Sequence, residues 1–207
     1  MSTDTSSFSS MAILISGRGS NMCVLADKVA SGDLPGSISF VGSDREKAQG
    51  LEAARIRGLT TRVFPYEELG RERAEESLIQ ALLESGVTWI VLAGFMKILS
   101  ARFVAEFGGR IVNIHPSLLP AFPGVDAIGQ ALKYGVKVTG VTVHLVDRKV
   151  DHGPILAQQA VSVPEQVDRE TLEARVHAAE HDIYWKTLKN LFEGRYVEHG
   201  RRRKLDA

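Results

Sequence analysis

Short apolar runs alternate with longer stretches of helical periodicity along the first part of the chain. The runs predict buried strands over residues 11–15, 38–41, 60–64, 87–92 and 110–114. Between them apolar residues recur every three or four positions, as over 46–57 and 71–85, which predicts amphipathic helices. Strands separated by helix-length segments are typical of a mostly parallel sheet with helices on both faces. We therefore expect a doubly wound α/β fold with a Rossmann-like N-terminal half.

The pattern changes beyond residue 136. Alternating apolar residues predict longer strands over 137–145 and 155–163, and the short polar segment between them favours an antiparallel pairing. Helical periodicity returns over 168–192. We expect a single domain over residues 11–196, preceded by a flexible Ser- and Thr-rich tail (1–10) and followed by a basic tail (197–207).

Composition excludes several classes of protein. The chain has 207 residues, of which 44% are hydrophobic and 24% charged, so disordered and fibrous classes do not fit. Lys and Arg number 25, as do Asp and Glu, and this neutrality argues against nucleic-acid or membrane-surface partners. The one cysteine, Cys23, cannot form an internal disulfide. With neither a secretory leader nor an apolar run near the ~20 residues of a membrane helix, we expect a cytoplasmic protein.

The first candidate site is the turn Gly17-Arg-Gly-Ser-Asn21, between a predicted strand and a predicted helix. Two glycines let backbone N–H groups approach a ligand, and the helix N-terminus favours an anion. A dinucleotide fingerprint needs a third glycine where Met22 stands, although Asp44 after the second strand imitates its ribose-binding acid. We favour a phosphate cradle, and a plain helix cap is the alternative.

The second candidate site is the pair Asn113 and His115, which are two residues apart and so share one face of their strand. Buried parallel strands rarely carry two polar side chains there. Pro116 ends the strand, which places the pair at its carboxyl end, where open α/β sheets bind ligands. An amide beside an imidazole could stabilise a developing oxyanion. A hydrogen-bonded pair with a purely structural role is the alternative.

The third candidate is Asp151, in the loop 150–154. Its carboxylate could orient an imidazole and favour the protonated form of the ring, although an ordinary turn would explain the same residues. We interpret His144, on a predicted strand, as a structural residue. His152 lies in the turn, and we assign it no role in the site.

Two further patterns have simpler explanations. His177 and His181 have the spacing of a helical zinc pair, but the sequence lacks the glutamate of H-E-x-x-H, so we expect no metal. The basic run 201–204 could bind anions, and a solvated tail is the preferred interpretation.

Taken in order, the motifs resemble those of the folate-dependent formyltransferases. They are the strand–GxGSN–helix start, Leu92-Ala-Gly-Phe-Met-Lys-Ile-Leu-Ser100, Asn113-Ile-His-Pro-Ser-Leu-Leu-Pro120 with Phe122-Pro-Gly124, and Asp151-His-Gly-Pro-Ile155. The resemblance runs from residue 11 to about 196. It implies formyl transfer from 10-formyltetrahydrofolate, without a metal. The GSN loop and the chain length favour the branch that formylates the amine of 5′-phosphoribosylglycinamide (GAR) in purine biosynthesis.

The resemblance also implies roles for individual residues. Catalysis would fall to Asn113, His115 and Asp151. Residues implied to bind GAR are Gly19, Ser20, Asn21, Gly94, Met96, Ile114, Pro116 and Glu180. Residues implied to bind folate are Arg71, Met96, Lys97, Ile98, Leu99, Val104, Asn113, Val146, Asp147, Val150 and Asp151. The partners would be these small molecules, and the protein a monomer or homodimer.

The chain departs from the family motifs at a few of these positions. The departures are Lys97, where Arg is frequent, Asp126 and Ile128, where many members have histidine, His177, where some have Gln, and Arg18, an added cation in the phosphate loop.

Four alternatives remain at this stage. Methionyl-tRNA formyltransferases normally carry an added C-terminal domain, and formyltetrahydrofolate hydrolases an added N-terminal one, which 207 neutral residues would not accommodate. A nicotinamide-dependent oxidoreductase could share the strand–turn–helix start. An inactive family member could act as a binding module, although the complete catalytic trio argues against it.

Overall fold

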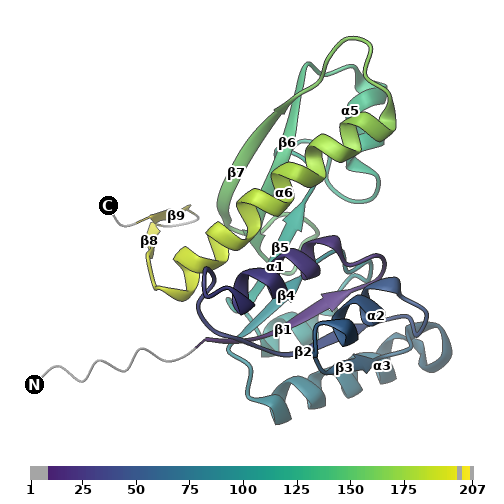
Figure 1. The fold of residues 1–207 in the computed structure, drawn as a ribbon, viewed down its shortest axis with the longest axis vertical. Coiled ribbons are helices and arrows are strands. Elements are labelled where there is room, and N and C mark those ends of the chain that lie inside the picture. The colour runs from purple at the N-terminus through teal and green to yellow at the C-terminus, as the bar shows by residue number, and fades with distance from the viewer. Residues whose placement is uncertain (1–8, 200–201, 206–207) are drawn as a thin grey trace, which may run out of the picture.

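A seven-stranded sheet forms the centre of the molecule (Figure 1). The computed structural model describes residues 9–199 and 202–205. The strands of the sheet are β1 (Ser10–Ile15), β2 (Ser37–Ser43), β3 (Thr61–Val63), β4 (Trp89–Leu92), β5 (Ile111–His115), β6 (Val138–Leu145) and β7 (Ile155–Ser162). Their spatial order is β3-β2-β1-β4-β5-β6-β7. Strands β1 to β5 are parallel, β6 pairs antiparallel with β5, and β7 pairs antiparallel with β6. The expected doubly wound sheet with later antiparallel strands is confirmed.

Helices cover both faces of the sheet. One core cluster packs beneath α1 (Ser20–Ala30), α2 (Gln49–Ile56), α5 (Ala127–Tyr134) and α6 (Arg169–Phe192). The other core cluster packs against α3 (Tyr66–Ser85) and α4 (Ala101–Glu106). Figure 1 shows α6 running along β6 and β7 and continuing past α1, so this one helix joins the parallel and antiparallel parts of the sheet.

Tyr184 anchors α6 to the sheet. Its side chain is buried, and its hydroxyl lies 2.9 Å from the carbonyl oxygen of Leu92 and 3.2 Å from that of Val112. Burial raises the pKa of this phenol well above its ordinary value, so the hydroxyl keeps its proton and donates. The helix is thereby positioned over the end of β4 and the first half of β5.

Two short helices, α4 and α5, were not predicted from the sequence. Each has only a turn or two of apolar periodicity, and each begins at a side-chain cap: Ser100 accepts the N–H of Phe103, and Asp126 accepts that of Gly129. In α3, the backbone at Gly70 is not helical (φ 74°), so this element is a short helix before Gly70, which was not predicted, and a longer helix from residue 71, as the periodicity indicated.

The termini differ in part from expectation. Ser10 already belongs to β1, and residues 1–8 of the predicted tail lie outside the described part of the chain. Where we expected a solvated basic tail, β8 (Tyr196–His199) pairs with β9 (Arg202–Leu205), and β9 lies beside β7. Tyr196 packs against the core, which gives this hairpin an apolar anchor. Within the described residues, none of the helices is long and apolar enough to span a membrane.

Candidate active site

The strands β1, β4 and β5 end side by side at the same edge of the sheet. Strand order reverses between β1 and β4, which is where doubly wound folds form a ligand crevice. Ser16 joins the loops after these two strands, because its N–H donates to the Gly94 carbonyl (3.0 Å) and its Oγ accepts the N–H of Met96 (2.8 Å). The predicted phosphate turn and the segment 93–99 are therefore neighbours.

The structure brings Asn113, His115 and Asp151 together beside the carboxyl end of β5. The Nδ1 atom of His115 lies 3.4 Å from Oδ2 of Asp151, and the two side chains are only 7% and 9% exposed. The Nε2 atom of the same ring lies 2.8 Å from the carbonyl oxygen of Phe122. Both ring nitrogens thus face oxygen acceptors, an arrangement that a doubly protonated imidazolium satisfies.

Asp151 also connects two loops. Its backbone is in the left-handed region (φ 49°), and its Oδ2 accepts the N–H of Gly124 at 2.7 Å. The loop between β6 and β7 is thereby fixed against the loop that follows β5.

His144 belongs to the same cluster, although the sequence analysis assigned it a structural role. It lies on β6 directly opposite Asn113, and its Nε2 is 3.2 Å from Nδ2 of Asn113 and 3.7 Å from Oδ1 of Asp151. Its Nδ1 lies 2.9 Å from the carbonyl oxygen of Leu145. Strand alternation could have indicated that its side chain points to the same side as those of Asn113 and His115, but only the antiparallel register places it next to Asn113.

A second group of residues surrounds the start of α1. Gly19 occupies the N-cap position with φ 71°, and a Cβ there would lie 3.0 Å from the Cα of Gly50, so the turn requires glycine. No side chain caps the helix, and Ser20 is exposed on its first turn. Asn21 donates from Nδ2 to Oε2 of Glu180 on α6 at 3.0 Å. Burial raises the pKa of Glu180 to about 7, and the hydrogen bond from Asn21 opposes that shift.

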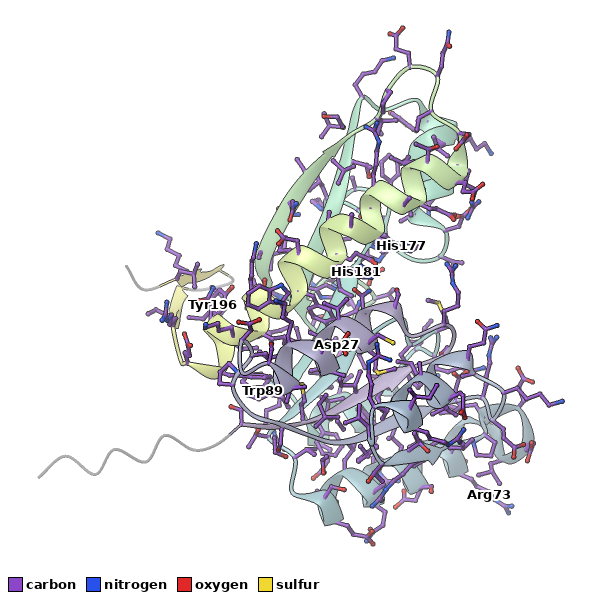
Figure 2. The ribbon with its side chains drawn as sticks, viewed as in Figure 1. Asp27, Arg73, Trp89, His177, His181 and Tyr196 are labelled. Carbon is purple, nitrogen blue, oxygen red and sulfur yellow. The ribbon has the colours of Figure 1, made fainter. Side chains whose placement is uncertain are left out.

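His177 and His181 are labelled in Figure 2 on the stretch of α6 that passes α1. Burial lowers the pKa of both imidazoles, and the positive charge of Arg18 lowers that of His177 further, while Glu173 acts in the opposite direction. In the described ranges, 9–199 and 202–205, no three His, Cys, Asp or Glu side chains form a group that could hold a metal.

Most of the residues implied to bind folate lie on two loops, after β4 and between β6 and β7, whereas Arg71, Val104 and Asn113 lie on α3, α4 and β5. Phe95, Leu99 and Val146 pack against the core cluster of α3 and α4. Val104 is buried within the same cluster. Three apolar side chains of these loops stay exposed, namely Met96 (67%), Ile98 (65%) and Val150 (52%). These three residues form an exposed apolar surface, which lies next to the polar cluster of Asn113, His115 and Asp151.

Charged residues around this apolar surface are partly committed to ion pairs. Asp44 is buried and lies 3.5 Å from Nζ of Lys97, so it serves as a counterion, and the ribose-binding role considered for it has no support. Arg71 is half exposed and donates to Glu75, which also accepts the N–H of Ser100. Glu75 was not predicted from the sequence, and it links Arg71 to the start of α4.

Three more of the residues implied to bind substrates are Asp147, Ile114 and Pro116, and each has a different environment. Asp147 lies 2.8 Å from Nδ1 of His152, within the β6–β7 loop. Ile114 is buried in the core cluster beneath α6, on the face of β5 opposite Asn113, and Pro116 is half-buried. The side chain of Ile114 therefore faces the core, and only its backbone is available to a ligand.

Comparison with known proteins decides the family. The sequence profile of the formyl transferase family matches residues 9–188. The chain belongs to this family. It is 39% identical over 181 residues to the phosphoribosylglycinamide formyltransferase of Bacillus subtilis, covering 87% of this chain and 93% of that protein. It is 42% identical over 175 residues to the enzyme of the same name from Mycobacterium tuberculosis, covering 84% and 80%.

Solved structures with the same fold include enzymes of two names. Glycinamide ribonucleotide transformylase 1 from Symbiobacterium toebii superimposes with a TM-score of 0.92 at 42% identity, covering 96% of this chain and 94% of that one. A formyltetrahydrofolate deformylase from Pseudomonas syringae has a TM-score of 0.90 at 24% identity and shares the fold.

Two departures from the formyl transferase motifs have a structural explanation. Asp126 caps α5, and its Oδ1 lies 2.7 Å from Nη2 of Arg169 at the start of α6. Ile128 is buried beneath α6. Both residues therefore join α5 to α6, a role that does not require histidine.

Proposed function

We propose that this protein transfers the formyl group of 10-formyltetrahydrofolate to the primary amine of GAR in purine biosynthesis. The products are formylglycinamide ribonucleotide and tetrahydrofolate. The observation that carries the proposal is the cluster of Asn113, His115 and Asp151 beside the end of β5, in a formyl transferase chain whose relatives are named for this reaction. Residues 11–196 would form the catalytic domain.

The chemistry required of the cluster is stabilisation of an oxyanion. The neutral amine of GAR attacks the formyl carbon, forming a C–N bond and placing negative charge on the formyl oxygen. When the tetrahedral intermediate collapses, the bond to the folate N10 breaks, N10 takes up a proton, and the former amine loses one. Asn113 and His115 supply N–H donors for the oxygen, which is the largest electrostatic contribution in reactions of this class.

Asp151 supports this role of His115. Its carboxylate faces Nδ1, so the positive charge of an imidazolium is compensated inside a buried site. The Nε2–H donates to the Phe122 carbonyl in this structure. A formyl oxyanion is a stronger acceptor than a carbonyl, and it would take over this hydrogen bond.

The start of α1 would hold the phosphate of GAR. Gly19, Ser20 and Asn21 present backbone N–H groups at an uncapped helix N-terminus, where the helix dipole favours an anion. Glu180, which accepts from Asn21, would contact GAR itself. Gly94, Met96, Ile114 and Pro116 would form the adjoining wall of the GAR site.

The exposed apolar surface would hold the pterin of the folate. Its exposed members are Met96, Ile98 and Val150, and the half-buried Leu99 and Val146 and the buried Val104 would line the pocket beneath them. The cations Arg71 and Lys97 lie nearby for the carboxylates of the folate, and Asp147 belongs to the same loop as Val150. We further propose that the enzyme acts in the cytoplasm on these small molecules, as a monomer or homodimer, with no metal.

A substrate-omission assay tests this function. Purified protein is incubated with 10-formyltetrahydrofolate, with and without GAR, and tetrahydrofolate is quantified. We expect tetrahydrofolate to form only when GAR is present, in equal amount to formylated GAR. Release of formate at the same rate without GAR would identify a hydrolase instead.

A further inference from the structure

A hydrogen bond between neighbouring strands connects His144 to the catalytic cluster. In the antiparallel pairing of β5 and β6, His144 stands opposite Asn113, and its side chain is only 1% exposed. Burial lowers the pKa of His144, while the carboxylates of Asp151 and Asp147 oppose this shift and His115 adds to it. The ring is therefore held in its neutral form, which carries one proton.

The neighbours of the two ring nitrogens determine where that proton lies. Nδ1 is 2.9 Å from the carbonyl oxygen of Leu145, which can only accept, so the proton is on Nδ1. Nε2 then has a lone pair, and it lies 3.2 Å from the Asn113 Nδ2, which can only donate. The Asn113 amide is thus fixed with its NH₂ group toward His144.

We infer that His144 is a positioning residue that sets the orientation of the Asn113 amide for catalysis. With one N–H of Nδ2 bound to His144, the second N–H of the same group is the donor available to the formyl oxygen. Without an acceptor at this position, the amide can rotate by half a turn and present its carbonyl oxygen, which would repel the oxyanion. This inference rests on the proposed formyl transfer.

Two substitutions separate this role from packing. His144→Phe keeps a flat ring of similar size but removes the acceptor, and His144→Gln places an amide oxygen near the position of Nε2. Removing an oxyanion donor costs about 10²–10³ in turnover, so misorienting it should lower kcat by about 10–100-fold in the Phe variant. We expect the KM for GAR to change less than about twofold, and the Gln variant to regain part of the lost kcat.

A double-mutant cycle shows whether the effect acts through Asn113. In the Asn113→Ala background, His144→Phe should lower kcat by less than about twofold, because the group that it orients is gone. Val141→Ala, a buried change on the same strand, is the control for general destabilisation and should leave kcat unchanged. An equal loss from His144→Phe in both backgrounds would overturn the inference.

An NMR measurement tests the geometry without turnover. Long-range ¹H–¹⁵N correlations of the wild-type protein at neutral pH should show His144 as the neutral Nδ1–H tautomer. The Nε2 resonance should shift in Asn113→Ala, which lacks the donor. A proton on Nε2, or on both nitrogens, would overturn the inference whether or not the protein turns over GAR. Absence of GAR-dependent turnover in the wild type would instead count against the proposed function.

Discussion

The carboxylate of Asp151 lies 3.4 Å from Nδ1 of His115, with both side chains almost completely buried. A buried charge is costly unless it is paired and hydrogen-bonded. The carboxylate meets both conditions, because Oδ2 also accepts the N–H of Gly124. The charge of the Asp151 carboxylate is therefore compensated inside the site. The same side chain connects the two loops that surround it.

Replacing that charge should impair chemistry more than binding. In Asp151→Asn the side chain keeps its size, but the imidazolium of His115 loses its counterion. We expect kcat to fall by at least about 10²-fold, with a much smaller change in the KM for GAR, measured by steady-state kinetics. Asp182→Asn, on the exposed side of α6, is the control and should leave both constants unchanged. A variant that keeps more than about a tenth of the wild-type kcat would contradict the role assigned to Asp151.

Glu180 should make stability depend on pH. Its pKa is raised from 4.5 to about 7, so the folded protein binds a proton more tightly than the unfolded chain does. The resulting stabilisation is fully present below pH 4.5 and is lost as the pH rises through 7. Between pH 5 and pH 8 this group should lower the free energy of unfolding by about 2–3 kcal/mol.

The variant Glu180→Gln isolates that contribution, because it keeps an acceptor for Asn21 and removes the titration. Urea unfolding of the wild type and the variant at both pH values is the measurement. The variant should lose less stability than the wild type between pH 5 and pH 8. Equal losses in the two proteins would show that Glu180 titrates as an exposed carboxyl does.

Substitutions in the turn before α1 should raise the KM for GAR and leave that for 10-formyltetrahydrofolate nearly unchanged. Ser20→Ala combined with Asn21→Ala removes a hydroxyl from the first helical turn and the hydrogen bond to Glu180. We expect a large rise in the KM for GAR and little change in that for 10-formyltetrahydrofolate. Ser31→Ala, at the opposite end of α1, is the matched control. Equal increases for both substrates would refute the assignment of this turn to the phosphate.

Tyr184 should contribute to stability through its hydroxyl. Tyr184→Phe leaves the carbonyls of Leu92 and Val112 without this donor, in a fully buried environment. We expect the free energy of unfolding to fall by about 1–2 kcal/mol in urea denaturation. Tyr134→Phe, at a residue that is 81% exposed, should change it by less than about 0.5 kcal/mol. An unchanged Tyr184→Phe protein would contradict the anchoring role.

The parts of the fold that were predicted are those with strong periodicity. The apolar strands and the long helix α6 have a sustained pattern, whereas α4 and α5 are short and depend on single capping residues. The hairpin after α6 depends on Tyr196, which packs against the core. The basic composition of this segment gave no indication of that contact.

Asn113, His115 and Asp151 were singled out from motifs, but two residues that hold predicted site residues in place were missed: His144, beside Asn113, and Glu75, beside Arg71. His144 acts through the register of β6 against β5. Glu75 lies on α3 and accepts the N–H of Ser100, at the start of α4, which is distant in the sequence. Such long-range relationships have no local pattern in the sequence.

The fate of the formyl carbon tests the central claim most directly. The donor is prepared with ¹³C in its formyl group, mixed with GAR and the wild-type protein, and followed by ¹³C NMR. The account predicts that the label moves to a formamide carbon on GAR, and that the double variant Asn113→Ala with His115→Ala leaves it on the folate over the same period. Label that appears as free formate, or that reaches GAR equally fast with the double variant, would contradict it.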